Sequence, residues 1–473
     1  MKVEQIYTGC LAEAAYYLES NGEAIIIDPL REYAPYLDRA EKSGAKIKYI
    51  LETHFHADFV SGHRDLAKKS GATIVFGPTA KPAYEAHVAE DGEVLKFGNA
   101  EIVVLHTPGH TMESSTFLLR DEQGKDNAIF TGDTLFIGDV GRPDLVQKVK
   151  ADITPDYLAS LLFDSLQNKI MPLANDVIVY PGHGAGSACG KNMSKETTDT
   201  LGHQKEVNYA LRPGLTKEQF IKEVTDGLVE PPQYFPHNVL MNILGGLPTI
   251  DDVLKQGTTA LSPDAFQLVQ EVENALIIDT RKKDEFTKAF IPGAIFIGID
   301  DSFAPWVGTL VTDLKQPILV IAEEGREEEV VLRLSRVGYD NAKGFLKGGM
   351  EAWIKEGKPV DSIKDMEASA FADFYLSNEH VKLLDVRRDS EFKSQHLMGA
   401  TSFPLDFINS NMSSVQPEQT YYLHCAGGYR SVIAASILKA RGFDNLVNIL
   451  GGFKQLSETE IPKTDYVCPT TML

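Results

Sequence analysis

An internal repeat in the second half of the chain most strongly limits the possible folds. The segments LIIDTRKKDEFTKAFIPGA (276–294) and LLDVRRDSEFKSQHLMGA (383–400) share Asp, Arg, Glu-Phe and Gly-Ala at an offset of 106 residues. LVIAEEGREEEVVLRLSRVGYDN and LHCAGGYRSVIAASILKARGFDN then align without gaps at an offset of 104, and a Gly-Gly pair follows each. We therefore predict two tandem α/β domains, at residues 255–358 and 365–473.

The first 245 residues have a different pattern, in which short apolar runs stop at clusters of His, Asp and Gly. KIKYILETH ends at His54, EIVVLHTPGH at His110, NAIFTGD at Asp133 and DVIVYPGHG just after His183. Each run has the length of a strand and is rich in β-branched residues. For residues 1–245 we predict sheets covered by helices, with polar loops gathered at one end of the sheets.

Three local signals support this reading of the first domain. YYLESNGEAIIID predicts a β-hairpin that turns at Asn21 and Gly22. REYAPYLDRAEKSG and HRDLAKKSG predict helices that end at Gly44 and Gly71, since glycine is the common residue just after a helix.

Length, charge and cysteine content exclude several classes of protein. A chain of 473 residues is too long for one hydrophobic core, and its formal net charge of −21 argues against a nucleic-acid partner. The four cysteines lie far apart, so we expect no disulfide scaffold. No apolar run approaches the ~20 residues that a membrane helix needs. We expect a soluble, cytoplasmic protein that binds no membrane.

The polar residues at the predicted strand ends are of the types that bind metals. Imidazole and carboxylate groups suit zinc, iron or manganese. One such histidine alone would be explained as a loop cap, but six such residues among the turns TPGH, TGD and PGHG predict a metal site. The candidates are His54, His56, Asp58, His110, Asp133 and His183.

In this order, THFHAD, TPGH, TGD and PGHG resemble the metallo-β-lactamase family over about the first 240 residues. The resemblance implies a four-layer αββα sandwich. The family includes zinc β-lactamases, glyoxalase-II-like thioesterases, flavin-linked diiron proteins and mononuclear iron persulfide dioxygenases. Its binuclear hydrolases use a His after the Asp to help hold a second metal, and here that residue is Phe59, which has no lone pair to offer. We therefore expect one metal.

The resemblance to persulfide dioxygenases also implies roles for these residues. His54, His110 and Asp133 match their pattern of two histidines and one carboxylate. Such a set implies one Fe(II) per chain with positions left for a substrate sulfur and O2, whereas zinc has no redox chemistry. Three further residues would orient the ligands or a water without binding the metal: His56, Asp58 and His183.

Two further residues near the expected metal have two alternative roles each. Arg142, in GDVGRPDL, resembles the basic residue that persulfide dioxygenases place near the thiol substrate. It is expected to bind a carboxylate or phosphate of the substrate, with a salt bridge inside the loop as the alternative. Cys189, in GHGAGSACGKN, is interpreted as either a bystander or an accessory thiol that accepts sulfur.

The last repeat contains a second candidate site. In YYLHCAGGYRSVIAASILKARGF, a strand run leads to Cys425, a tight loop to Arg430 and then a helix. Loop N–H groups, the helix N-terminus and Arg430 favour negative charge and so lower the pKa of the thiol. The six-residue span resembles the rhodanese sulfurtransferases, which implies that Cys425 carries a sulfane sulfur and that Arg430 steadies anionic donors or acceptors. Protein tyrosine phosphatases have one residue more in this loop.

The middle repeat lacks the thiol. The ungapped alignment puts Ile321 opposite Cys425 and Arg326 opposite Arg430. The loop is acidic, with Glu323, Glu324 and Glu327. Because no sulfur can be carried without a thiol, we predict that residues 255–358 form an inactive rhodanese-like domain acting as a spacer, a docking surface or an oligomer contact.

The whole chain resembles bacterial fusions of a persulfide dioxygenase with an inactive and an active rhodanese. The resemblance implies oxidation of a low-molecular-weight persulfide of glutathione, coenzyme A or a similar thiol by O2 to thiol and sulfite. The rhodanese would then join sulfite to a sulfane sulfur as thiosulfate, in sulfide detoxification, and such fusions commonly form homo-oligomers. Two alternatives stay open: a glyoxalase-II-like zinc thioester hydrolase with an added sulfurtransferase, and a non-enzymatic sulfur relay.

Overall fold

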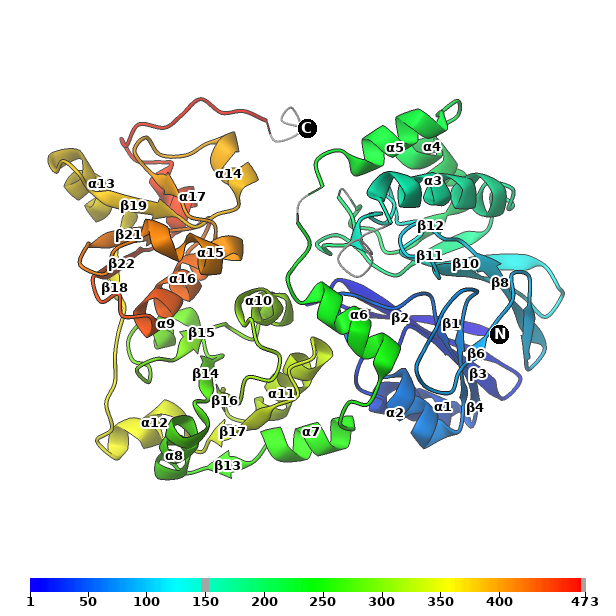
Figure 1. Cartoon of the computed structure of the whole chain (residues 1–473), viewed down its shortest axis with the longest axis horizontal. Helices are drawn as coiled ribbons and strands as arrows, with labels where there is room; N and C mark the ends of the chain where they lie inside the picture. Colours follow the sequence, from blue (N-terminus) through cyan, green and yellow to red (C-terminus); the bar gives the residue numbers. More distant parts are fainter. Residues whose placement is uncertain (146–152, 192, 229, 469–473) are drawn as a thin grey trace. The chain divides into compact units, whose positions relative to one another are not determined.

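The computed structural model describes residues 1–145, 153–191, 193–228 and 230–468, which form two compact units (Figure 1). The first unit contains Met1–Ile250 and the short segment Leu334–Gly338. The second contains Asp251–Arg333 and Tyr339–Leu473. Within the described residues, no helix has the length and apolar character needed to cross a membrane.

Two six-stranded sheets form the centre of the first unit. In the first sheet, β1 to β3 are antiparallel and β3 to β6 are parallel. Its strands, in spatial order, are β1 (Lys2–Thr8), β2 (Glu13–Ser20), β3 (Glu23–Ile27), β4 (Lys46–Glu52), β5 (Thr73–Phe76) and β6 (His87–Val88). In the second sheet, β10 and β11 are parallel and the other neighbours antiparallel. Its strands, in spatial order, are β12 (Asp199–Thr200), β11 (Ile178–Pro181), β10 (Asp126–Gly132), β9 (Ser115–Arg120), β8 (Ala100–His106) and β7 (Val94–Phe97).

Alternating apolar side chains stack these sheets and their helices into four layers. Successive side chains of a strand point to opposite faces of its sheet. On β2, Tyr16 and Leu18 lie in the core between the sheets, and Tyr17 lies in the core on the outer face. On β9, Phe117 lies between the sheets and Leu118 on the outer face. This arrangement confirms the expected αββα sandwich.

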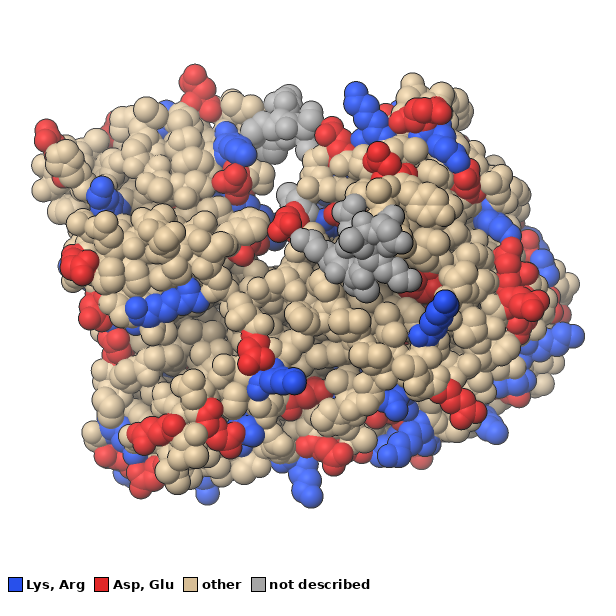
Figure 2. Space-filling view, in the orientation of Figure 1, with Lys and Arg blue, Asp and Glu red and all other residues tan. Residues whose placement is uncertain are grey.

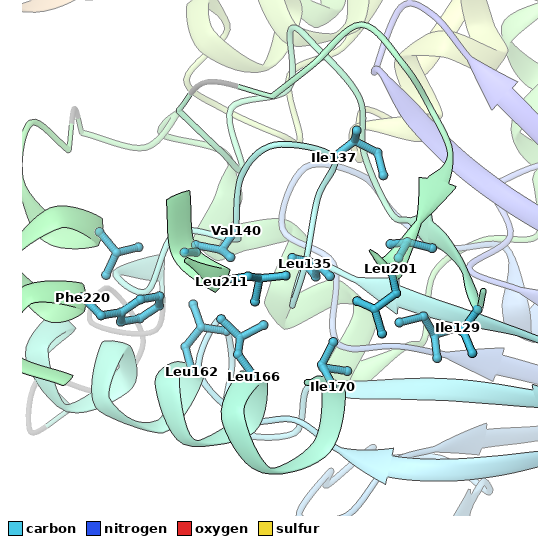
Figure 3. Packing of buried hydrophobic residues seen from close by; sticks show 14 of the residues in the cluster. Ile129, Leu135, Ile137, Val140, Leu162, Leu166, Ile170, Leu201, Leu211 and Phe220 are labelled. Carbon is cyan, nitrogen blue, oxygen red and sulfur yellow. The ribbon is translucent and has the colours of Figure 1, made fainter. Parts of the chain in front are cut away.

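Helices cover the outer faces of both sheets. Against the second sheet, Leu162 of α3, Ile129 of β10 and Phe220 of α5 belong to one buried cluster (Figure 3). The helix bounds are α1 (Ala34–Ser43), α2 (His63–Ser70), α3 (Pro155–Ser165) with its continuation η2 (Leu166–Ile170), α4 (Leu201–Val207), α5 (Lys217–Thr225) and α6 (Phe235–Leu244).

The local predictions for this unit are confirmed. The hairpin between β2 and β3 turns at Asn21 and Gly22, whose φ angles of 43° and 78° are positive. Helices α1 and α2 end immediately before Gly44 and Gly71, which both adopt the left-handed conformation. Glycine suits these positions because it has no Cβ to clash there.

The second unit contains two five-stranded parallel sheets. The first is built from β13 (Ala260–Leu261), β17 (Ala342–Leu346), β16 (Ile318–Ile321), β14 (Leu276–Asp279) and β15 (Ile295–Phe296), in that spatial order. The second is built from β18 (Lys364–Met366), β22 (Leu446–Ile449), β21 (Tyr421–His424), β19 (Lys382–Asp385) and β20 (Thr401–Ser402). The helices in this part of the chain are α7 (Ile250–Gly257), α8 (Pro263–Glu273), α9 (Lys283–Phe286), α10 (Phe303–Leu310), α11 (Glu327–Arg336), α12 (Gly349–Lys355), α13 (Ala368–Ser377), α14 (Asp389–Ser394), α15 (Ile408–Asn411), α16 (Tyr429–Ala440) and α17 (Gly452–Leu456). Corresponding strands take the same order in both sheets, which confirms the two predicted α/β repeats.

The strand registers correct the alignment of the two repeats by one residue. Ile321 pairs with Asp279 at the place where His424 pairs with Asp385. Gly325 and Gly428 then follow at the same spacing, with positive φ angles of 84° and 98°.

The prediction that Ile321 stands opposite Cys425 was therefore wrong. Ala322 takes that position, and Glu327 rather than Arg326 takes the position of Arg430. The ungapped alignment failed because the helix after the loop begins and ends differently in the two repeats. The middle repeat still has no thiol at this position, since Ala322 carries only a methyl group.

Acidic and basic side chains are interspersed over the face of the protein drawn in Figure 2.

Candidate functional site

Three strand ends bring together His54, His110 and Asp133 in the first unit. His54 follows β4, His110 lies in the loop after β8, and Asp133 follows β10. One ligand atom from each lies within 4.8 Å of the others, and all three residues are buried. Asp133 Oδ2 is 3.3 Å from His110 Nε2 and 4.0 Å from His54 Nε2.

The hydrogen bonds of the two imidazoles leave their Nε2 atoms available to a cation. Thr53 Oγ1 donates to Asp28 at 2.8 Å, so it accepts from His54 Nδ1 at 3.0 Å. His110 Nδ1 donates to a backbone carbonyl at 2.8 Å. Each ring therefore carries its proton on Nδ1 and presents the lone pair of Nε2 toward Asp133, the usual arrangement for a metal-binding histidine.

The charge state of this cluster also fits a metal. Burial, followed by the neighbouring histidines, lowers the pKa of His54 well below its ordinary value, so the ring is neutral as a metal ligand must be. Among the described residues, neither carboxylate oxygen of Asp133 has a hydrogen-bond partner, although both are buried. A buried carboxylate is costly unless it is paired or coordinates a metal. The residues therefore fit a divalent cation.

A second group of possible ligands adjoins the first. Atoms of Asp58, His183 and Cys189 lie within 4.8 Å of one another, and all three residues are buried. His183 Nε2 is 3.5 Å from Asp58 Oδ2 and 3.6 Å from Asp133 Oδ1. Burial, then Asp133 and Asp58, raises the pKa of the Cys189 thiol well above its ordinary value. Without a cation this thiol is therefore protonated and a poor nucleophile.

The ring of His56 lies 4.2 Å from that of His54 between centroids, but its Nε2 atom points to two carboxylates outside the first group. Its Nε2 atom lies 3.1 Å from Asp28 and 3.6 Å from Glu52. Burial would lower the pKa of His56, but the carboxylates outweigh burial and raise it to about 9. The ring of Phe59 stacks on His56 with centroids 4.2 Å apart. A hydrocarbon ring and two carboxylates thus surround His56.

Arg142 makes contacts within its own loop and with the loop that follows β11. Its guanidinium donates two hydrogen bonds to Asp144, at 2.7 and 2.8 Å, and one to the carbonyl of Ala188. Its own carbonyl is the acceptor for His110 Nδ1. These contacts support the salt-bridge alternative and hold the His110 ring in place, while a direct substrate contact by Arg142 stays a prediction.

An apolar cavity of about 430 Å³ adjoins His110. Lys81 and Glu113 are its charged lining residues. Its apolar lining comes from Phe55, Ala57, Ala80, Met112, Leu145, Ile153, Val239 and Ile243. The sequence did not reveal this cavity, because apolar residues from scattered segments look like ordinary core residues.

Asn242 of α6 is a further residue that the sequence did not single out. Its amide nitrogen donates to the carbonyls of His56 and Phe59, at 2.8 and 2.9 Å, and its oxygen accepts from the N–H of Ser61 at 3.0 Å. The side chain thus fixes the loop that follows β4 and carries His54.

Replacing Asn242 with Ala should weaken metal retention about 10- to 100-fold, the usual effect of losing a group that supports metal ligands. It should also destabilise the fold by about 1–3 kcal/mol, because three buried backbone groups lose their partner. Metal titration and thermal unfolding would measure both effects. Asn238→Ala is the matched control: Asn238 is buried on the same helix, and among the described residues its side chain has no hydrogen-bond partner. Equal effects of both substitutions would contradict the positioning role.

In the second unit, Cys425 lies in the tight loop between β21 and α16. The thiol is buried, and its Sγ accepts a hydrogen bond from the N–H of Gly428 at 3.1 Å. Arg430 pairs with Glu391 through two bonds of 2.6 and 2.9 Å. Burial would raise the pKa of Glu391, but Arg430 outweighs burial and lowers it. The loop can stabilise a thiolate, although Arg430 is already engaged by a carboxylate.

Gly452, at the start of α17, packs directly under this loop. A Cβ at this position would lie 2.3 Å from the carbonyl oxygen of Cys425. Gly452→Ala should therefore displace the loop, slow any reaction of the thiol and cost about 1–3 kcal/mol of stability. Gly427→Ala is the stability control, since an added Cβ there meets no atom within 4 Å. Thermal unfolding and the rate of alkylation of Cys425 would test the prediction, and equal melting temperatures for the two variants would contradict it.

Comparison with known proteins gives a family to each part of the chain. Residues 8–183 match the metallo-beta-lactamase superfamily, and residues 262–356 and 371–459 match the rhodanese-like domain. The Homo sapiens mitochondrial persulfide dioxygenase is 30% identical over 229 residues, covering 48% of this chain and 81% of that protein. A probable hydroxyacylglutathione hydrolase of Schizosaccharomyces pombe is also 30% identical, over 204 residues, covering 42% of this chain and 74% of that protein.

A solved structure extends this likeness to three dimensions. The crystal structure of a metallo-beta-lactamase from Staphylococcus aureus is 30% identical, with a TM-score of 0.63, and covers 73% of this chain and 98% of that one. The described sheets, the buried His and Asp cluster and these likenesses agree. The chain belongs to the metallo-beta-lactamase superfamily and carries two rhodanese-like domains after its αββα sandwich.

Proposed function

We propose that this protein is a persulfide dioxygenase with an attached sulfurtransferase. A low-molecular-weight persulfide, O2 and water would give the parent thiol and sulfite: the terminal sulfur gains both oxygen atoms of O2, and water cleaves the S–S bond. The main support is that His54, His110 and Asp133 present three donors to one point, while Phe59 stands where the binuclear hydrolases that the sequence resembles have a His for a second metal.

The donor set favours iron. Two neutral imidazoles and one carboxylate are the set typical of non-haem Fe(II) oxygenases, and one Fe(II) per chain would supply the oxygen chemistry. The protein supplies orientation: Thr53 and the carbonyl of Arg142 hold the two histidine rings with Nε2 inward. The cavity beside His110 would hold the organic arm of the thiol and limit access of water.

The second step would take place at Cys425. Its thiolate attacks the outer sulfur of a sulfane donor, forms a Cys425–S–S bond and releases the donor's remaining group with the electron pair of the broken bond. Sulfite then attacks the outer sulfur of that persulfide, forming thiosulfate and restoring the Cys425 thiolate. Neither step needs an added oxidant or reductant.

A zinc thioester hydrolase is the second candidate function, and one observation favours it. Asp58, His183 and Cys189 adjoin the first cluster closely enough to form a second cation site, as a binuclear hydrolase requires. The probable hydroxyacylglutathione hydrolase of Schizosaccharomyces pombe is a relative at the same 30% identity.

Substrate tests with the purified full chain would separate the two functions. With glutathione persulfide or coenzyme A persulfide, we expect uptake of one O2 per sulfite equivalent formed, and none when the corresponding thiol replaces the persulfide. Hydrolysis of a glutathione thioester without any persulfide-dependent oxygen uptake would reject the dioxygenase and establish the hydrolase.

A further inference from the structure

A cavity of about 340 Å³ in the second unit is lined by residues of both repeats. The middle repeat supplies Asp301, Ser302 and Trp306, and the last repeat supplies Arg388, Glu391, Tyr429 and Arg430. Tyr429 and Arg430 directly follow the loop of Cys425 and begin α16. The cavity thus adjoins the reactive loop, although the middle repeat has no thiol of its own at the corresponding position.

Direct contacts attach the start of α16 to the middle repeat. The hydroxyl of Tyr429 donates to the carbonyl of Gly298 at 3.2 Å, and its ring meets Phe296 edge-on at 5.6 Å. About two turns further along α16, the hydroxyl of Ser436 accepts from the N–H of Phe296 at 2.9 Å. Both groups of that last bond are buried. The middle repeat therefore fixes the helix that follows the cysteine loop.

The cavity has a residue that can receive an anion. Arg430 is paired with Glu391, whereas Arg388 is 67% exposed and lies 3.8 Å from its carboxylate neighbour Asp406. Arg388 thus has more capacity to bind an incoming oxyanion. Across the cavity, Ser302 offers a hydroxyl and Trp306 a large ring, while Asp301 repels excess negative charge.

We propose that the middle repeat is a working part of the sulfur-transfer site: it holds the Cys425 loop through Tyr429 and forms the wall that selects small sulfur oxyanions. This inference rests on the proposed sulfur transfer by Cys425. It assigns Trp306 as a specificity-determining residue and Tyr429 as a positioning residue. A cavity of about 340 Å³ is large enough for sulfite or thiosulfate.

Steady-state sulfur transfer by the full chain, with thiosulfate as the donor and cyanide as the acceptor that takes the sulfur from Cys425, tests the role of the middle repeat in substrate binding. Trp306→Ala should raise KM for thiosulfate about 10-fold with kcat changed less than about 3-fold, because it removes a binding surface rather than the nucleophile. Trp306→Phe should restore most of the affinity. Val272→Ala is the control, since Val272 is 75% exposed on α8 of the same repeat.

Tyr429→Phe tests the positioning role and removes only the hydroxyl that bonds Gly298. It should lower kcat about 3- to 10-fold and leave KM unchanged, because the loop is held less well. Fluorescence gives an independent readout: the chain has two tryptophans, and Trp353 is buried. Loading Cys425 with sulfur should change the emission of the native protein, and Trp306→Phe should remove that change.

Two failures can be told apart. If the native protein transfers sulfur while Trp306→Ala and Tyr429→Phe both behave as it does, the inference is overturned and the proposed function stands. If the native protein is no more active than Cys425→Ser, the proposed function fails and the inference fails with it.

Discussion

Replacing Asp133 with Asn should abolish persulfide-dependent oxygen uptake. Asp133 is buried, and its Oδ2 atom lies 3.3 Å from His110 Nε2. The neutral amide is a poor metal ligand and would direct N–H groups at the lone pairs of the histidines. Metal retention and oxygen uptake should both fall more than about 100-fold, beyond the effect of losing an outer supporting group. Metal analysis and an oxygen electrode would measure these losses.

The same variant should keep its sulfur transfer, because Cys425 belongs to the other compact unit. Asp176→Asn is the control: Asp176 lies in the first unit, but its side chain is 59% exposed and paired with Lys125. Full iron content and normal oxygen uptake in Asp133→Asn would show that this carboxylate is not a ligand.

Cys425→Ser should have the opposite effect, abolishing sulfur transfer and sparing oxygen uptake. A serine hydroxyl is a far weaker nucleophile than the cysteine sulfur, which accepts the N–H of Gly428, so transfer should fall about 1,000-fold or more. With persulfide and O2 supplied, this variant should accumulate sulfite where the native protein forms thiosulfate. Ion chromatography of the products would show the difference.

Cys468→Ser provides the matched control, since Cys468 is exposed near the end of the described residues. It should give the native product pattern. Thiosulfate formed at the native rate by Cys425→Ser would assign sulfur transfer to another thiol, and Cys189 would be the next residue to replace.

The sequence predicted the fold well because the main signals are periodic and local. Apolar runs of strand length predicted β4, β8 and β10, and the turn at Asn21 and Gly22 needs no distant contact. The sequence could also predict that His54, His110 and Asp133 lie together, for a related reason. Polar residues that follow strand ends collect at one edge of a sandwich, and the structure brings these three together.

Side-chain direction was much harder to predict than position. Arg142 turns to Asp144, two residues away, and His56 turns to Asp28 and Glu52, because nearby carboxylates compete with any substrate or metal. The spacing of a motif does not indicate which neighbouring group a side chain will bind.

Features that depend on tertiary packing were missed or misplaced. Asn242 lies more than 180 residues from the carbonyls that it holds, so no local pattern marks it. Only the strand register showed that Ala322, and not Ile321, lies opposite Cys425, because a sequence alignment alone allows an error of one residue here.

Measuring activity as a function of the amount of bound metal tests the central claim most directly. The apoprotein should be titrated with Fe(II) under anaerobic conditions, and oxygen uptake with a persulfide measured at each step. We predict that activity rises in proportion to bound iron and levels off at one iron per chain, and that zinc occupies the site without supporting oxygen uptake. Activity that needs two metal ions per chain, or that zinc alone supports as thioester hydrolysis, would contradict the account.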